Sequence, residues 1–333
     1  MVRSRFGRGL AACVTVLALL SSGLLVAGCS TAPIDTGKSV DPSTVLRDGP
    51  QTATLPDTDV APVEKNPPVS ARAQRIIALD INGTLGNIVF ALGLGPHVVG
   101  RDQSTTFASA RDLPLVTENS HAINAEKVLA QNPSIVLAGQ DATPSGVLDQ
   151  LRASGIDVVT FTSERIVSGT PKLIRDVAAA LDVQAAGEKL VARTQQQIDQ
   201  AKRDLPSPTG DPTMAFVYIR GEHLILLAGP GSGADDLIGA LGGRDAGTAA
   251  GLTGAFTMVS TESMMRANPA VILVMTQGAD SVGGIDGVLK LPAVAGTDAG
   301  RHRRIVQMDE TQMLAFGPDV GLVLGALGKA IYR

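Results

Sequence analysis

Residues 126–137 read EKVLAQNPSIVL, and residues 262–273 read ESMMRANPAVIL. In each copy a glutamate stands six residues before an Asn-Pro pair, which is followed by a run of aliphatic residues. Because proline cannot continue a helix and short Ile/Val/Leu runs suit strands buried on both faces, each copy predicts a short helix and then a parallel strand. The unit recurs 136 residues later, so we expect two similar α/β lobes. Two such lobes form a cleft, which is a common place for a ligand.

Strands and helices alternate on both sides of these two units, which is typical of an α/β fold. Between Pro171 and Leu205 aliphatic residues keep a helical spacing without internal proline, so we predict one long interlobe helix, with a possible break near Asp182. The predicted fold class is α/β, with two Rossmann-like lobes whose sheets are mostly parallel. The expected boundaries are residues 73–168 for the N-terminal lobe, 169–206 for the interlobe helix and 207–333 for the C-terminal lobe.

The N-terminus has the layout of an export signal. Three arginines within the first eight residues precede an uncharged stretch, residues 9–28, which predicts a signal peptide over residues 1–28. The stretch ends in small residues before Cys29 and resembles the lipobox of bacterial lipoproteins, which implies that Cys29 becomes the lipid-modified first residue. A plain transmembrane helix is the alternative, because the apolar length is near the ~20 residues that span a bilayer. The polar tract after Cys29 favours the lipoprotein.

Composition narrows the function further. Residues 29–72 are rich in Pro, Thr, Asp and Ser, which predicts a disordered tether after the lipidated cysteine. The other cysteine, Cys13, lies in the signal, so no thiol remains for a disulfide or a thiolate metal ligand. The formal charge of −4 becomes −7 without the three signal arginines, which argues against a nucleic-acid partner.

The lipobox, the repeated Glu-helix-Asn-Pro-strand unit and the bridging helix together resemble the helical-backbone class (class III) of substrate-binding proteins of ABC importers. The likeness covers residue 73 to the C-terminus. Members of this class capture cobalamin, ferric siderophores, haem or metal ions. The resemblance implies a monomeric receptor on the outer face of the cytoplasmic membrane, which delivers its ligand to a permease and its ATPase and is not an enzyme.

Two side chains of the second lobe are candidates for iron binding. Tyr218 stands near the end of that lobe's first predicted strand, where α/β sheets present ligands, and a phenolate is a hard ligand suited to Fe(III). Arg220, two residues on, shares its face and favours the ionised phenol. On residue frequencies alone, a half-buried strand tyrosine beside a surface arginine is the commoner interpretation.

His121 is the candidate in the first lobe. It lies in a polar loop just before the helix whose predicted N-cap is Asn124, and neutral imidazole is a good ligand for haem iron. A solvated loop histidine is the commoner interpretation of an isolated His.

The stretch VYIRG at residues 217–221, with residues 224–233 and Gly242-Gly243, resembles the haemin-binding lipoproteins of actinobacterial haem importers. In that family an axial His from the N-terminal lobe and an axial Tyr from the C-terminal lobe hold ferric haem b, and an Arg is hydrogen-bonded to the Tyr. Carried over, these residues are His121, Tyr218 and Arg220, and Met275 matches a pocket methionine. The resemblance also admits upstream surface proteins that relay haem to the receptor.

Glu126 and Glu262 occupy equivalent positions in the first turns of the two repeated helices, where a carboxylate interacts favourably with the helix dipole. The family adds a second role, because one exposed glutamate per lobe forms a salt bridge with the permease. Two other functions stay open on the sequence. One is the same fold carrying a ferric siderophore or cobalamin, and the other is a lipid-anchored haem enzyme.

Overall fold

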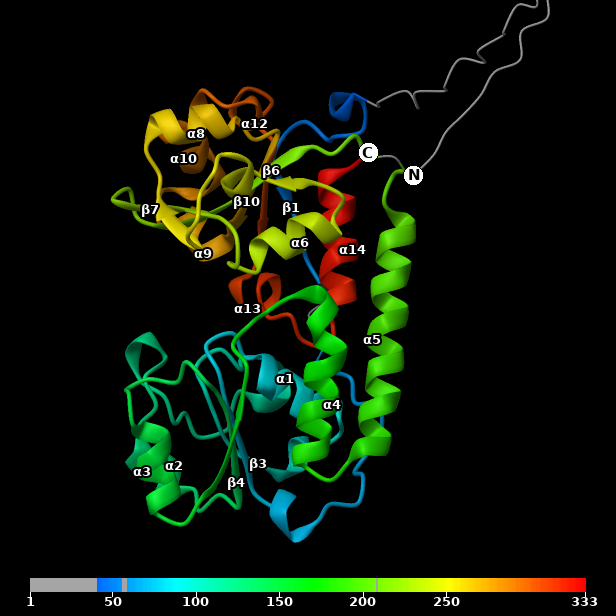
Figure 1. Ribbon diagram of the computed structural model, residues 1–333, viewed down its shortest axis with the longest axis vertical. Helices are drawn as coiled ribbons and strands as arrows, with labels where there is room; N and C mark the ends of the chain where they lie inside the picture. The colour runs from blue at the N-terminus through cyan, green and yellow to red at the C-terminus, as the bar shows by residue number, and fades with distance from the viewer. Residues whose placement is uncertain (1–40, 56–58, 208) are drawn as a thin grey trace, which may run out of the picture. The chain divides into compact units, whose positions relative to one another are not determined.

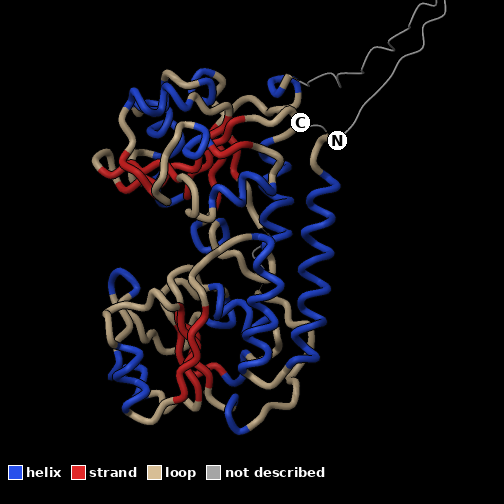
Figure 2. The backbone as a smooth tube through the Cα atoms, viewed as in Figure 1, coloured by secondary structure: helices blue, strands red, loops and turns tan. Residues whose placement is uncertain are grey.

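The computed structural model describes residues 41–55, 59–207 and 209–333, which belong to one compact unit of the chain. The predicted signal peptide, Cys29 and the first residues of the predicted tether lie outside them. Figure 1 and Figure 2 show that this unit is built of two lobes, each with strands inside and helices around them. The predicted α/β class is confirmed.

The N-terminal lobe contains a four-stranded parallel sheet in the order β3-β2-β4-β5. Strands β2 and β4 are buried along their whole length, as their aliphatic runs predict. The strands are β2 (Ile76–Leu79), β3 (Val98–Arg101), β4 (Ile135–Gly139) and β5 (Asp157–Phe161). The α-helices of this lobe are α1 (Thr84–Ala91), α2 (Ala125–Ala130), α3 (Val147–Ala153) and α4 (Thr170–Ala180), with 3-10 turns η2 (Ala71–Ala73), η3 (Gly95–His97), η4 (Ala108–Ala110), η5 (Asn119–His121) and η6 (Val167–Gly169).

The C-terminal lobe contains a seven-stranded mixed sheet in the order β1-β11-β10-β6-β7-β9, with β8 beside β6. Its first four strands are parallel, and the edge formed by β7 and β9 is antiparallel. The strands are β1 (Gln51–Thr52), β6 (Thr213–Arg220), β7 (Leu224–Ala228), β8 (Arg244–Asp245), β9 (Phe256–Met258), β10 (Val271–Met275) and β11 (Ile305–Met308). The helices are α6 (Ala234–Ala240), α7 (Ala246–Ala249), α8 (Thr261–Ala267), α9 (Thr276–Asp280), α10 (Gly284–Lys290), α11 (Pro292–Ala295), α12 (Asp298–Arg301), α13 (Glu310–Met313) and α14 (Val320–Ile331), and η1 (Pro42–Thr44) is a 3-10 turn.

The repeated sequence unit forms the same structure twice, as α2 followed by β4 and as α8 followed by β10. Each helix has a side-chain cap, because Asn124 accepts a hydrogen bond from the amide of Lys127 and Ser260 accepts one from the amide of Ser263. Each helix is followed by an asparagine with positive φ, Asn132 at 48° and Asn268 at 36°. Asparagine tolerates the left-handed conformation, which turns the chain into the Pro-led strand.

The predicted single interlobe helix is wrong in one respect, because it is two helices. Helix α4 ends at Ala180, Asp182 has φ +59°, and α5 (Gln184–Asp204) runs back along α4 (Figure 1). The 21 residues of α5, about 30 Å long, reach the second lobe and pack against α14. This contact requires Gly321, where a Cβ would lie 2.4 Å from the carbonyl carbon of Gln197. No helix in the described part of the chain is long and apolar enough to cross a bilayer.

The prediction that a disordered tether extends to residue 72 is wrong for residues 41–55 and for residues 59–72. The second segment packs on the core of the N-terminal lobe, and the amide of Val63 donates to the carbonyl of Ala91 at 2.8 Å. The first segment belongs to the C-terminal lobe. Strand β1 pairs in parallel with β11, and Leu46 is fully buried in the core of the C-terminal lobe. Asp48 accepts a hydrogen bond of 2.8 Å from Arg304, whose side chain is 3% exposed. The polar composition of residues 29–72 does not reveal this ordered segment. One buried leucine, one ion pair and two strand residues are enough to hold it on the lobe.

Replacing Leu46 with alanine is expected to lower the free energy of unfolding by about 2–4 kcal/mol, because it leaves a cavity in the core. Urea denaturation measures this loss. Ser43→Ala, at an exposed position of the same segment, should change stability by less than about 0.5 kcal/mol. Equal midpoints for the two variants would mean that residues 41–55 are not part of the folded unit.

Candidate ligand-binding site

Tyr218 lies near the carboxyl end of β6, half-buried, and packs against the core cluster that contains Phe216. Its ring meets the ring of Phe256 edge to face, with centroids 6.3 Å apart. The guanidinium carbon of Arg220 lies 4.7 Å from the centroid of the tyrosine ring. Tyr218 and Arg220 are therefore in contact, but through the ring face as a cation–π contact and not through the hydrogen bond that the family resemblance implies. The guanidinium donates to the carbonyl of Ile219 at 3.1 Å instead.

An apolar patch extends from Tyr218 across the antiparallel edge of the sheet. Leu226 of β7 pairs with Tyr218 on one side and with Met258 of β9 on the other. Met258 is 60% exposed and Phe256 is 40% exposed, which is unusual for large apolar side chains on a sheet. Sequence reasoning missed Phe256 and Met258. The sequence offers one indication of them, because two large apolar residues alternate with a threonine, as in a short strand with one apolar face.

Met275 ends β10, the strand next to β6. Its side chain is 6% exposed and belongs to the core cluster on which Tyr218 packs. Met275 is thus placed below the exposed surface, on the same face of the sheet as Tyr218.

His121 occupies the last position of η5, on the other lobe. Both Ser120 and His121 have positive φ, 60° and 62°, a conformation that costs free energy for residues with a Cβ and is often found at functional sites. The ring nitrogens lie 3.3 Å from the hydroxyl of Ser104 (Nδ1) and 3.3 Å from the side-chain amide nitrogen of Gln103 (Nε2). Burial lowers the pKa of His121 and so favours the neutral imidazole, and the charge of Asp80 opposes this effect only in part.

Two buried carboxylates support this part of the site. Asp80 and Asp102 follow β2 and β3, at the carboxyl edge of the sheet. Asp80 pairs with Arg165, Oδ2 to Nη2, at 2.9 Å, and both side chains are almost fully buried. Burial raises the pKa of Asp102 to about 7, and the negative charge of Asp80 adds to this effect.

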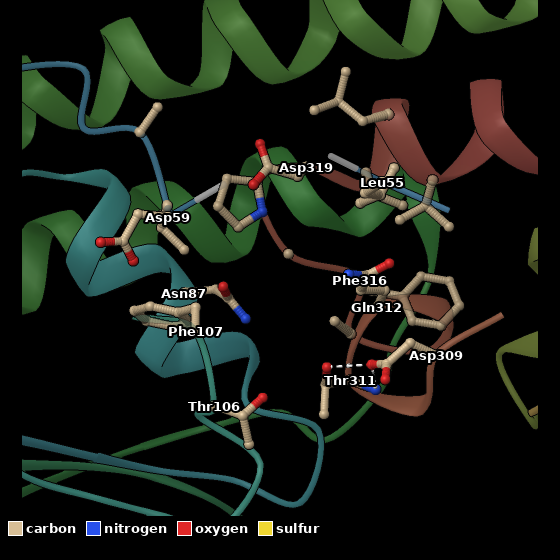
Figure 3. A pocket seen from close by; sticks show the side chains of 18 of the residues that line it. Leu55, Asp59, Asn87, Thr106, Phe107, Asp309, Thr311, Gln312, Phe316 and Asp319 are labelled. Carbon is tan, nitrogen blue, oxygen red and sulfur yellow. Dashed lines mark hydrogen bonds between the residues drawn. The ribbon is translucent and has the colours of Figure 1, made fainter. Parts of the chain in front are cut away.

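A cavity of ≈ 410 Å³ lies between the lobes (Figure 3). It is lined by the N-terminal lobe, by α5 and by the segment after β11, with Asn87, Phe107, Asp309 and Phe316 among its walls. His121, Tyr218, Arg220 and Met275 do not line it, although Ser104, the neighbour of His121, does. The predicted ligand residues therefore fall into two groups, with Tyr218, Arg220 and Met275 together on one lobe and His121 on the other.

Two α/β lobes that each present polar side chains near the carboxyl ends of their strands, joined by a long helix, define a two-lobed ligand-binding protein. The chain belongs to the periplasmic binding protein family, whose model matches residues 81–311.

Solved structures with the same fold include the heme binding protein HmuT, which is 30% identical to this chain and has a TM-score of 0.79, over 88% of this chain and 99% of HmuT. The periplasmic heme-binding protein RhuT from Roseiflexus sp. RS-1 is 36% identical, with a TM-score of 0.73, over 78% of this chain and 97% of RhuT. A vitamin B12-binding protein from Vibrio campbellii is 25% identical over 158 residues. That match covers 47% of this chain and only 55% of the Vibrio protein.

Proposed function

We propose that this protein is an extracytoplasmic receptor that binds ferric haem b between its lobes and delivers it to an ABC permease and its ATPase for iron uptake. The observation that carries the proposal is the pair of candidate axial ligands, a neutral His121 on one lobe and Tyr218 beside Arg220 on the other. A neutral imidazole and a phenolate both bind ferric iron. The protein then acts as a carrier, since two axial protein ligands leave no open iron position for catalysis.

The structures of HmuT support this assignment of residues. That protein has also been solved with single alanine replacements of a histidine, a tyrosine and an arginine. In HmuT the tyrosine precedes the arginine by two positions, as Tyr218 precedes Arg220 here. The histidine precedes the tyrosine by 99 positions in HmuT, and His121 precedes Tyr218 by 97.

The surface around the candidate ligands fits a flat apolar macrocycle. Leu226, Phe256 and Met258 supply an apolar patch next to Tyr218. On the N-terminal lobe, Ile81 is 46% exposed, and its carbonyl bonds to the serine that holds His121. Burial of such side chains against a porphyrin is worth roughly 25 cal/mol per Å². Phe256 and Met258 thus supply apolar contact surface that a tryptophan often provides, and the chain has no tryptophan.

Cobalamin is the second candidate ligand, because the curated relatives at 25–26% identity are vitamin B12-binding proteins. Cobalamin and ferric siderophores already carry most of their metal ligands, so neither has a need for both His121 and Tyr218. Their binding would be indifferent to the removal of either side chain.

Titration of the chain from residue 30 onward with ferric haemin tests the proposal. We expect saturation at one haem per chain and a shifted, intensified haem absorption band. Parallel titrations with cyanocobalamin and with a ferric siderophore should show no saturable binding. Weak, non-saturable haemin binding together with tight binding of either alternative would overturn the assignment to haem.

We also propose that the protein is anchored to the outer face of the cytoplasmic membrane through lipid on Cys29. The lipobox-like end of the predicted signal supports this. Cys29→Ser is expected to release the protein from the membrane fraction or to leave it as an uncleaved precursor. After cell fractionation, the membrane fraction of the variant should contain no processed form of the protein. An unchanged membrane-bound, processed band would exclude lipidation at this residue.

Glu126 and Glu262 are proposed to dock the receptor onto the permease. Both lie in the first turn of the equivalent helices α2 and α8 and are exposed, and Glu262 is 3.9 Å from Arg266 on the same helix. A receptor that binds a two-fold symmetric transporter needs one such contact on each lobe. The repeat supplies them at matching positions.

Replacing both Glu126 and Glu262 with alanine is expected to lower haem uptake by cells about 10-fold or more while leaving haem affinity unchanged. The double variant Glu188→Ala and Asp199→Ala removes two exposed carboxylates of α5 and serves as the control. Equal uptake by the two double variants would show that the glutamates only stabilise their helices.

A further inference from the structure

The ring of His121 is held between two side chains of the loop that follows β3. Its Nδ1 lies 3.3 Å from Ser104 Oγ, and its Nε2 lies 3.3 Å from Gln103 Nε2. Which nitrogen carries the proton decides which one can bind a metal, because only the unprotonated nitrogen has a lone pair to offer. The hydrogen bonds of Ser104 determine this.

Ser104 has a single hydroxyl proton, and it donates that proton to the carbonyl oxygen of Ile81 at 2.7 Å. Toward His121 the same hydroxyl can therefore only accept, which places the imidazole proton on Nδ1. Nε2 is then an acceptor, and the facing amide nitrogen of Gln103 is a donor. The opposite tautomer would set the N–H of Nε2 against this amide N–H and leave Nδ1 without a donor.

We propose that Ser104 is a positioning residue that fixes His121 as the Nδ1–H tautomer, so that Nε2 is the atom offered to iron, and that the Gln103 amide occupies Nε2 until the ligand arrives. This inference rests on the proposed function, in which His121 is a haem ligand. It adds the choice of nitrogen, the residue that makes the choice and a group that must leave on binding.

The loop that carries Gln103 and Ser104 is itself fixed by hydrogen bonds to Asp102 and Thr117. Asp102 accepts hydrogen bonds from the amides of Ser104 at 3.0 Å and Thr105 at 2.7 Å with one oxygen, and from the amide of Asp80 at 2.9 Å with the other. The amide of Gln103 donates to Thr117 Oγ1 at 3.0 Å, which ties the loop to the segment that leads into η5. Ser104 is 9% exposed. Its hydroxyl therefore has a fixed position relative to His121, as a group that selects a tautomer requires.

The two neighbours of the imidazole have different consequences for binding. Removing the Ser104 hydroxyl takes away the acceptor of the Nδ1 proton and leaves only the Gln103 amide to favour this tautomer, so the other tautomer becomes populated. Loss of such an outer partner of a metal-binding histidine typically lowers affinity 10- to 100-fold. Removing the Gln103 amide deletes a hydrogen bond that exists only in the ligand-free protein. Haem then has no competitor for Nε2, and its affinity should rise.

The tautomer can be measured without haem. The chain contains four histidines, so incorporation of ¹⁵N-histidine into the full-length protein in detergent gives four sets of imidazole signals, and His121→Ala identifies that of His121 by its loss. At pH 8, where the ring is neutral, the wild type should show a protonated Nδ1 and an unprotonated Nε2. A protonated Nε2 in the wild type overturns the proposal whether or not the protein binds haem.

Three variants isolate the role of each neighbour. Ser104→Ala should convert the His121 signals to a mixture of tautomers, whereas Ser104→Thr, which keeps the hydroxyl, should retain the Nδ1–H form. Gln103→Ala should leave the tautomer unchanged. Only the ¹⁵N chemical shift of Nε2 should change, toward the value of an imidazole nitrogen that accepts no hydrogen bond. Ser109→Ala removes an exposed hydroxyl of the same region and should change nothing. Unchanged signals of the other three histidines verify that each variant is folded.

Haemin titration of the same variants completes the test. We expect an affinity about 10-fold or more lower in Ser104→Ala and about 2- to 10-fold higher in Gln103→Ala. An unaltered His121 tautomer in Ser104→Ala, or an unaltered affinity in Gln103→Ala, would refute the corresponding role. If the wild type bound no haem, the proposed function would fail, and the tautomer data would still decide whether Ser104 positions His121.

Discussion

Tyr218→Ala is expected to lower the affinity for ferric haem by on the order of 100-fold and to remove the tyrosinate-to-iron charge-transfer band. The reason is that the phenolate is the anionic ligand of the proposed pair and favours Fe(III). Absorption spectroscopy during a haemin titration measures both effects at once. His121→Ala should alter the spectrum while keeping the charge-transfer band, because the anionic ligand remains.

Tyr218→Phe separates ligation from packing. Phenylalanine keeps the edge-to-face contact with Phe256 and the ring under the guanidinium of Arg220, so only the oxygen is lost. This variant should lose the charge-transfer band as completely as Tyr218→Ala does. Retention of the band in Tyr218→Phe would show that Tyr218 is a wall of the site and not a ligand.

The remaining tyrosine, Tyr332, is the matched control. Its hydroxyl is buried and donates to the carbonyl of Leu241 at 2.8 Å, and burial raises its pKa far above the usual range. It is therefore unavailable as a phenolate. Tyr332→Phe should lower the free energy of unfolding by about 1 kcal/mol, because the carbonyl of Leu241 loses its partner, and should leave the haem spectrum unchanged.

Arg165→Ala is expected to lower the free energy of unfolding by about 3–5 kcal/mol, because it leaves the carboxylate of Asp80 buried without a counter-charge. The guanidinium also donates to the carbonyl oxygen of Thr162 at 2.6 Å and to Thr84 Oγ1 at 3.2 Å. Thr84 in turn bonds to the carbonyl of Ala315, which comes from the C-terminal lobe. Urea denaturation, followed by circular dichroism, measures the loss.

Arg152→Ala is the control for the loss of an arginine in an ion pair. Arg152 lies 2.9 Å from Asp149 on the exposed face of α3, where such a pair contributes about 0–0.5 kcal/mol. Losses of similar size in Arg165→Ala and Arg152→Ala would show that the buried network is dispensable. A large loss in Arg165→Ala alone would identify the buried network as a main contribution to the stability of the protein.

Other contacts join the same regions of the two lobes. Asp236 on α6 accepts a hydrogen bond of 2.6 Å from the amide of Val167, and Thr170 donates one of 3.0 Å to the carbonyl of Phe316. Gly233 also fits closely here, because a Cβ at this position would lie 2.8 Å from the carbonyl oxygen of Arg165. The connection between the lobes therefore depends on side chains as much as on the covalent chain.

The secondary structure was largely predictable from local patterns. The two Asn-Pro units, the caps at Asn124 and Ser260 and the aliphatic strands β4 and β10 follow from residues close together in the chain. The break at Asp182 was also foreseen, but its consequence was not. A short turn gives no local indication of whether the second helix continues or folds back, because that depends on the surfaces against which α4 and α5 pack.

The candidate site was predictable only as separate residues. Tyr218 and Arg220 share a strand, so their contact followed from the alternation of side chains. The neighbours of His121, Gln103 and Ser104, were missed because they are 18 and 17 residues away in a loop without a motif. The exposed Phe256 and Met258 were missed for another reason, because exposure is a property of the assembled sheet.

The sequence by itself determined the α/β class, the two related lobes and the candidate ligand residues, because periodicity, proline position and residue chemistry act over a few neighbouring residues. The tertiary structure decided which residues surround each candidate, how α4 and α5 fold together and that residues 41–55 belong to the C-terminal lobe. These properties depend on contacts such as Leu46 in its core and Asp80 with Arg165, between residues far apart in the chain. Burial and pairing of this kind exist only once the chain has folded, which is why no local pattern encodes them.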